Sequence, residues 1–266
     1  GTIYLASARG VFMTIRNRIT STVAFIALAA GTFLSAPALA VETKSYYGYA
    51  TDLKTGEYRY TEVHNHQYDG DNWLSGTMKF YAPDGRFMGD KTLDFSKDAY
   101  IPLVTFTLGG GRYQDSIAAI SDKSVTVKTK RDKDIETELI TRQKNLAADS
   151  GFNSLLVDNL DKFKAGKAVD LSLIVIGRRD FYRFKAVPKD QLDFAGEKAI
   201  RISIQPDSLL RFVVDPLNVI YGLESKSLLR YEGISNILDR DTGKPFNVRI
   251  DYRIKPNKLP AKLSDL

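Results

Sequence analysis

The sequence predicts a mainly antiparallel β protein of the α+β class, in which an incomplete barrel or strongly curved sheet packs on one main helix. Segments rich in Tyr, Phe, Val, Ile and Thr recur about every ten residues, with Gly, Pro, Asp and Asn between them. One segment stands out with the apolar stripe of an amphipathic helix. Strands and helices do not alternate along the chain, which disfavours a doubly wound nucleotide-binding fold.

The first element has the three parts of a secretory leader, namely a basic start, an apolar run and a small-x-small cleavage site. They are, in order, Met13 with Arg16 and Arg18, residues 22–36, and Ala38 with Ala40. We therefore expect a signal peptide over residues 13–40, cleavage before Val41 and a periplasmic location. Residues 1–12 are interpreted as upstream read-through or an expression remnant. A retained anchor is the alternative, although a spanning helix needs about 20 mainly apolar residues.

The composition restricts what the mature chain can do. It contains no Cys, which excludes thiol chemistry, Cys-based metal sites and lipoprotein acylation. Loss of the leader arginines leaves only a small excess of Lys and Arg over the 32 acidic residues, so we expect no nucleic-acid partner. We expect a single β-rich domain over residues 41–254, not membrane-spanning after cleavage, and a loose tail rich in Pro and Lys over residues 255–266.

The domain begins with an antiparallel meander. Tyr-rich strand segments over residues 45–67 flank a Gly-bearing turn at residues 53–57. A tight reverse turn at residues 83–85 joins strands over 72–82 and 86–95. Further strands are expected at residues 103–108, 124–131, 137–142, 168–176, 180–187, 198–204, 210–214, 225–231 and 246–254.

The main helix is expected over residues 152–163, where Phe and Leu recur with helical spacing. Asp149 and Ser150 are the expected N-terminal caps, and Gly166 is the expected stop. Its apolar face must be buried, and the sheet is the surface available for it.

Glu62, His64 and His66 form the sharpest local pattern. Alternate residues of a strand share a face, so these side chains should project together, along with Tyr58, Tyr60 and Tyr68. A His-x-His pair on a strand is one way to hold zinc or iron. These are the only two His of the chain, and a third ligand would have to be Glu62, Asp69, Asp71 or a remote residue. We therefore interpret the pattern as a polar face of the sheet and keep a metal site as the alternative.

Two other segments offer candidate binding residues. Arg112 follows three glycines that lack the Lys and Ser or Thr of a phosphate loop, so a turn or bulge is the better interpretation. Arg178, Arg179 and Tyr182 belong to a basic, aromatic hairpin that suits an anionic glycan or lipid headgroup. A hairpin turn with solvated arginines is the alternative.

Three stretches together resemble an uncharacterised family of exported bacterial proteins. They are residues 80–95, 149–184 and 228–252, and the most specific piece is residues 231–236, from which Tyr231 and Glu232 are taken as candidate binding residues. The resemblance implies no known activity. The order of elements is also similar to that of the periplasmic lipoprotein carriers LolA and LolB, which have an unclosed antiparallel barrel with helices covering an apolar cavity. Fold analogy alone does not establish function.

We expect a periplasmic binding or carrier protein for an amphipathic, lipid-like ligand, without catalysis or a cofactor. One short helix cannot cover the apolar faces of so large a sheet, so a ligand, a partner or the protein's own side chains must fill the rest. The 14 Tyr and 14 Phe could fill the interior outright. The alternatives are an interaction module in cell-envelope assembly and a metal-dependent hydrolase that uses His64 and His66.

Overall fold

The fold is described from a computed structural model, over residues 40–207 and 215–253. The first half of the chain forms eight strands and one short 3-10 turn. In chain order they are β1 (Val41–Asp52), β2 (Tyr58–Asp69), β3 (Asn72–Tyr81), β4 (Phe87–Asp94), β5 (Leu103–Leu108), η1 (Gly109–Gly111), β6 (Tyr113–Ile120), β7 (Ser124–Arg131) and β8 (Asp134–Thr141).

The second half adds seven strands, two short helices and a second 3-10 turn. They are β9 (Leu146–Ala148), α1 (Gly151–Asp158), α2 (Leu160–Lys164), β10 (Val169–Val175), η2 (Ile176–Arg178), β11 (Asp180–Phe194), β12 (Glu197–Pro206), β13 (Leu217–Gly222), β14 (Leu228–Leu238) and β15 (Pro245–Arg253). Neither helix of the described residues is long and apolar enough to cross a bilayer.

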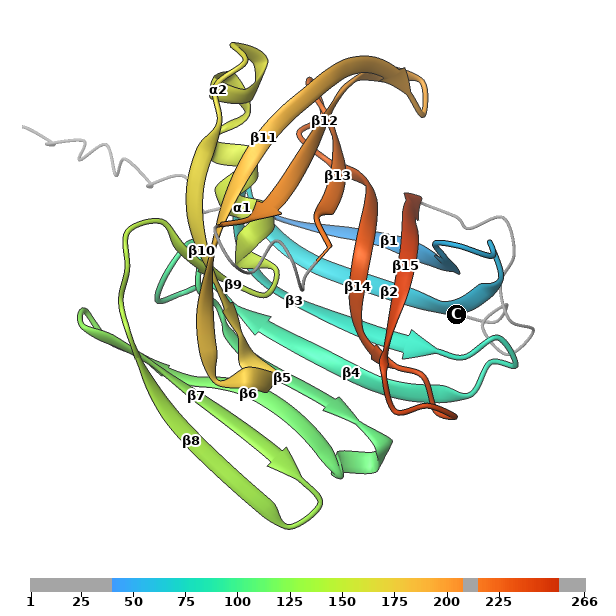
Figure 1. The fold of residues 1–266 in the computed structure, drawn as a ribbon, viewed down its shortest axis with the longest axis vertical. Coiled ribbons are helices and arrows are strands. Elements are labelled where there is room, and N and C mark those ends of the chain that lie inside the picture. The colour runs from blue at the N-terminus through green and yellow to red at the C-terminus, as the bar shows by residue number, and fades with distance from the viewer. Residues whose placement is uncertain (1–39, 208–214, 254–266) are drawn as a thin grey trace, which may run out of the picture. The chain divides into compact units, whose positions relative to one another are not determined.

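All fifteen strands belong to one sheet, in the order β8-β7-β6-β5-β4-β3-β2-β1-β15-β14-β13-β12-β11-β10-β9. Two meanders, β1 to β8 and β9 to β15, meet where the first strand pairs with the last, and Figure 1 draws these strands in blue and red. Every pairing is antiparallel except that of β9 with β10. The predicted class, mainly antiparallel β with helical cover, is therefore confirmed.

The strands do not close into a barrel. The two edges, β8 and β9, follow one another in the chain, but no pairing joins them within the described residues. Side chains nevertheless link distant parts of the sheet. Arg179, which follows η2, donates a hydrogen bond of 2.8 Å to the hydroxyl of Thr129 on β7 and pairs with Glu136 on β8.

The expectation of one helix over residues 152–163 is wrong, because the chain leaves helical geometry at Asn159 (φ −106°, ψ 8°). The Asn159 side chain donates to the carbonyl of Leu155 at 2.8 Å, a local bond that competes with a continuous helix. The expected side-chain cap is also absent at Ser150, whose amide and hydroxyl instead donate to Asp149. The stop is confirmed: Gly166 has φ +78°, and its amide bonds to the Phe163 carbonyl.

Three strands were not predicted from the sequence, and several predicted strands are shorter than the observed ones. β6, β9 and β13 were not expected, because their sequences lack a sustained alternation of polar and apolar residues. The strand expected at residues 210–214 lies outside the described residues. So do the tail at 255–266, residues 1–12 and all but the last residue of the expected leader.

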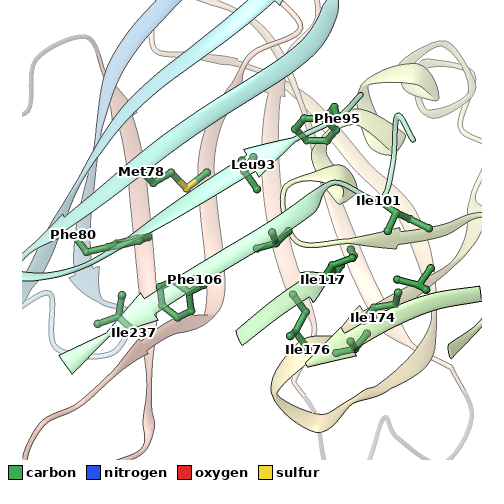
Figure 2. Packing of buried hydrophobic residues seen from close by; sticks show 14 of the residues in the cluster. Met78, Phe80, Leu93, Phe95, Ile101, Phe106, Ile117, Ile174, Ile176 and Ile237 are labelled. Atoms are coloured by element: carbon green, nitrogen blue, oxygen red, sulfur yellow. The ribbon is translucent and has the colours of Figure 1, made fainter. Parts of the chain in front are cut away.

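The buried apolar side chains form two clusters. One gathers residues of all eight strands of the first meander with others that include Ile174 and Ile176, so that β10 and η2 pack on the strands of the first meander. Figure 2 shows these two isoleucines beside Ile117 of β6. The second cluster sets Leu155 and Leu156 of α1 against β10 to β13. Burying the helices in this way stabilises both elements, since short helices gain most of their stability from packing.

Candidate functional site

A cavity of about 1850 Å³ is the principal candidate site. Its walls come from both meanders and from α1, and many of them are aliphatic or aromatic. Examples from five elements are Met78, Phe80, Val157, Leu173, Phe184 and Ile250. Lys44 and Lys226 also line it and are exposed, so the cavity communicates with solvent.

Polar residues of β2 form part of the wall. Glu62 and His64 line the cavity, although they are only 7% and 3% exposed. Nε2 of His64 lies 2.6 Å from a carboxylate oxygen of Glu62, and Nδ1 of His64 lies 2.9 Å from Nε2 of His66. The three side chains share one face, as their alternation predicts, and they form a hydrogen-bonded chain.

The chain of hydrogen bonds ends at His66. Its Nδ1 is buried and has no hydrogen-bond partner among the described residues. A carboxylate only accepts, so the Glu62 oxygen accepts from Nε2 of His64. Burial, and then the neighbouring His64, lower the pKa of His66 to about 3, so the His66 ring is neutral at neutral pH.

Tyrosine rings surround His64 and Glu62. Tyr46 stacks on His64 with centroids 4.6 Å apart, and Tyr252 meets both rings edge-on. The Tyr60 hydroxyl shares a hydrogen bond of 2.5 Å with Ser235. Burial raises the pKa of Tyr60, Tyr231 and Tyr252, and the Glu62 carboxylate is the second cause in each case. These phenols stay neutral and line the cavity.

Two buried or half-buried ion pairs also belong to the polar part of the wall. Lys91 of β4 donates to Asp149 at 2.7 Å, and both side chains are buried. Arg131 of β7 donates to Asp115 of β6 at 2.8 Å, and its guanidinium lies 3.6 Å from the centre of the Tyr113 ring. These cations are neutralised by the protein itself.

The structure separates the candidate binding residues into two groups. Arg178, Tyr182 and Tyr231 line the cavity. Arg112, Arg179 and Glu232 do not belong to its described lining, and each pairs elsewhere: Arg112 with Asp132, Arg179 with Glu136, and Glu232 with Arg249.

The candidate metal ligands Glu62, His64 and His66 hydrogen-bond to one another. Both nitrogens of His64 are engaged, one with Glu62 and one with His66. Within the described part of the chain, no group of three or more His, Asp or Glu side chains converges as metal ligands would. A metal-dependent hydrolysis would have to break this chain of hydrogen bonds first.

Several residues of the cavity wall were not predicted from the sequence. Lys91 and Asp149 lie on segments far apart in the chain, and their pairing has no local signal. Tyr46 belongs to the Tyr-rich segment over residues 45–67, for which only strands were predicted. Alternation along β1, with Tyr46 and Gly48 on the face that pairs with His64 and Glu62, was the signal that could have found it.

Comparison with known proteins gives a likeness to a solved structure and no match by sequence. No known family model matches this sequence, and no curated protein matches it. Among solved structures, the chain is similar to a β-barrel-like protein of a domain of unknown function, DUF1849, from Brucella abortus. The two are 11% identical with a TM-score of 0.43, and the match covers 81% of this chain and 98% of that one.

Proposed function

We propose that this protein is a periplasmic binding or carrier protein for an amphipathic, lipid-like ligand, and that it has no catalytic activity. The observation that carries the proposal is the cavity of about 1850 Å³, which is larger than the roughly 300–1,000 Å³ of ordinary small-molecule sites. In this proposal the open sheet acts as an incomplete barrel around the apolar part of the ligand.

The character of the wall supports an amphipathic ligand. Aliphatic and aromatic side chains suit an acyl or alkyl chain, whose burial stabilises a complex by about 25 cal/mol per Å². A few buried polar groups, among them Glu62 and Lys91, suit a headgroup that keeps hydrogen bonds when it leaves water. The periplasmic location rests on the leader expected at residues 13–40. Cell fractionation and a mature N-terminus at Val41 would test it.

The experiment is native mass spectrometry with lipid extraction on protein purified from cells without detergent, followed by titration with an alkyl-chain fluorophore. We expect a co-purified ligand or a saturable site. Val157 lines the cavity from α1, so Val157→Trp should fill part of it and weaken binding at least tenfold. Leu74→Trp adds the same ring at an exposed position outside the described lining and serves as the control. A protein that binds neither lipid nor fluorophore would contradict the proposal.

A further inference from the structure

The strand register places the Glu62 carboxylate beside an aromatic ring. Glu62, Gly48 and Tyr252 are neighbours in one row across β2, β1 and β15. A Cβ built at Gly48 would lie 2.9 Å from Oε2 of Glu62, 3.1 Å from Cγ2 of Ile250 and 3.2 Å from Cε1 of Tyr252. The carboxylate and the ring therefore meet over Gly48 and fill the space above it.

The neighbouring rows add further rings. On one side, Tyr46 of β1 pairs with His64. On the other, a row runs from Tyr60 through Ala50 and Ile250 to Tyr231. Tyr46, Tyr60, Tyr231 and Tyr252 all line the cavity, as does Glu62. A buried carboxylate with aromatic rings on both sides is the arrangement that attracts organic cations, because ring faces carry partial negative charge.

The charges of the cavity wall favour the same kind of ligand. Five cations belong to the described lining, and three of them are paired with acids: Lys91 with Asp149, Arg131 with Asp115, and Lys226 with Asp71. The other two, Lys44 and Arg178, are exposed. Glu62 is buried, and its side-chain hydrogen-bond partner within the described residues is His64, through one oxygen. A buried charge is costly unless it is compensated, so a ligand cation would be stabilised there.

We propose that the cavity selects amphipathic ligands with a cationic headgroup, of the quaternary ammonium or alkylated amine class, and that Glu62 and the tyrosines at positions 46, 60, 231 and 252 hold this headgroup. The proposal rests on the carrier function proposed above and specifies its ligand. The hydrocarbon chain lies along the apolar wall, and the headgroup lies where Glu62 and these tyrosines line the cavity.

The test uses three probes with the same twelve-carbon chain, titrated below their micelle concentrations by isothermal calorimetry. They are dodecyltrimethylammonium, dodecyl sulfate and dodecyl maltoside. We expect the ammonium probe to bind at least about tenfold more tightly than the other two, as a desolvated cation–π and charge pair would produce. Equal affinities, or a preference for the sulfate, would overturn the headgroup proposal and leave the carrier function standing. If none of the probes binds, the carrier function fails and the headgroup proposal fails with it.

Variants then test whether Glu62 and the tyrosines cause the preference for the ammonium probe. Glu62→Gln can still accept the bond from His64, and it should remove the preference for the ammonium probe while binding of the maltoside persists. Glu138→Gln changes the net charge equally on the edge strand β8, outside the described lining, and should keep the preference. Tyr252→Leu should weaken ammonium binding more than Tyr252→Phe, because Phe retains the ring. A preference that survives Glu62→Gln contradicts the assignment.

Discussion

The ammonium of Lys91 and the carboxylate of Asp149 meet at 2.7 Å, with only 5% and 7% of their side chains exposed. The bond joins β4 to the residue pair that precedes α1, and Asp149 adopts a left-handed conformation (φ 46°) to make it. The Lys91 ammonium also lies 5.1 Å from the centre of the Phe106 ring. This pair positions the start of α1 against the first meander.

We predict that breaking this pair from one side destabilises the protein more than replacing both partners. Lys91→Met leaves Asp149 as a buried charge without its cation, which costs about 3–5 kcal/mol. The double variant Lys91→Met, Asp149→Leu should cost clearly less than the sum of the single variants. Urea unfolding of the four proteins measures the coupling, and additive costs would show that the pair contributes little.

Gly76 is predicted to be intolerant of any side chain. A Cβ at this position would lie 1.9 Å from Nδ1 of His66, and His66 is fully buried. Gly76→Ala should therefore destabilise the protein by about 1–3 kcal/mol or more. The matched control is the same substitution in a His66→Ala background, where the clash is gone and the cost should be much smaller. Thermal unfolding of the set checks this, and an equal cost in both backgrounds would refute the packing account.

Acid should destabilise the protein through His66. Its pKa is lowered to about 3 in the folded protein from 6.5, because the ring is buried and lies next to His64. Between these values the unfolded chain binds a proton that the folded protein does not, so stability falls as the pH falls. One such group lowers the unfolding free energy by about 1.4 kcal/mol per pH unit.

The measurement for this prediction is urea unfolding at intervals from pH 7 to pH 4, on the wild-type protein and on His66→Gln. The variant loses the titrating ring and keeps a side chain that can donate to His64. Its stability should depend less steeply on pH below 6.5 than that of the wild type. Parallel profiles would mean that His66 does not stay neutral when the protein is folded.

Arg178 and Arg179 are adjacent but should respond differently to substitution. Arg178 lines the cavity, so Arg178→Ala should change ligand affinity with little effect on stability. Arg179 bonds to Thr129 and Glu136 on the first meander, so Arg179→Ala should lower stability by about 1–3 kcal/mol. Arg179 has φ 53°, a backbone conformation that glycine adopts without strain. Arg179→Gly removes the same side chain without adding strain, so it is the control for Arg179→Ala. Chemical unfolding and probe titration of the three variants separate the two roles.

Much of the local structure could be predicted because its signals are local. Strand formers and turn residues predicted most of the strands, and the period of two placed Glu62, His64 and His66 on one face. The helix prediction was right in position and wrong in continuity, since a single side-chain bond at Asn159 interrupts it. β13 was missed because it is a six-residue strand with little alternation, defined mainly by its pairing with β12 and β14.

The sequence by itself determined which segments extend, where they turn and which side chains share a face, because these depend on neighbours along the chain. Only the tertiary structure decided that β1 pairs with β15, which brings Tyr252 to Gly48 and completes the rings around Glu62. It also decided that Lys91 meets Asp149 and that a cavity remains between the meanders and α1. Contacts between distant segments depend on strand pairing and packing throughout the sheet, and no local pattern specifies them.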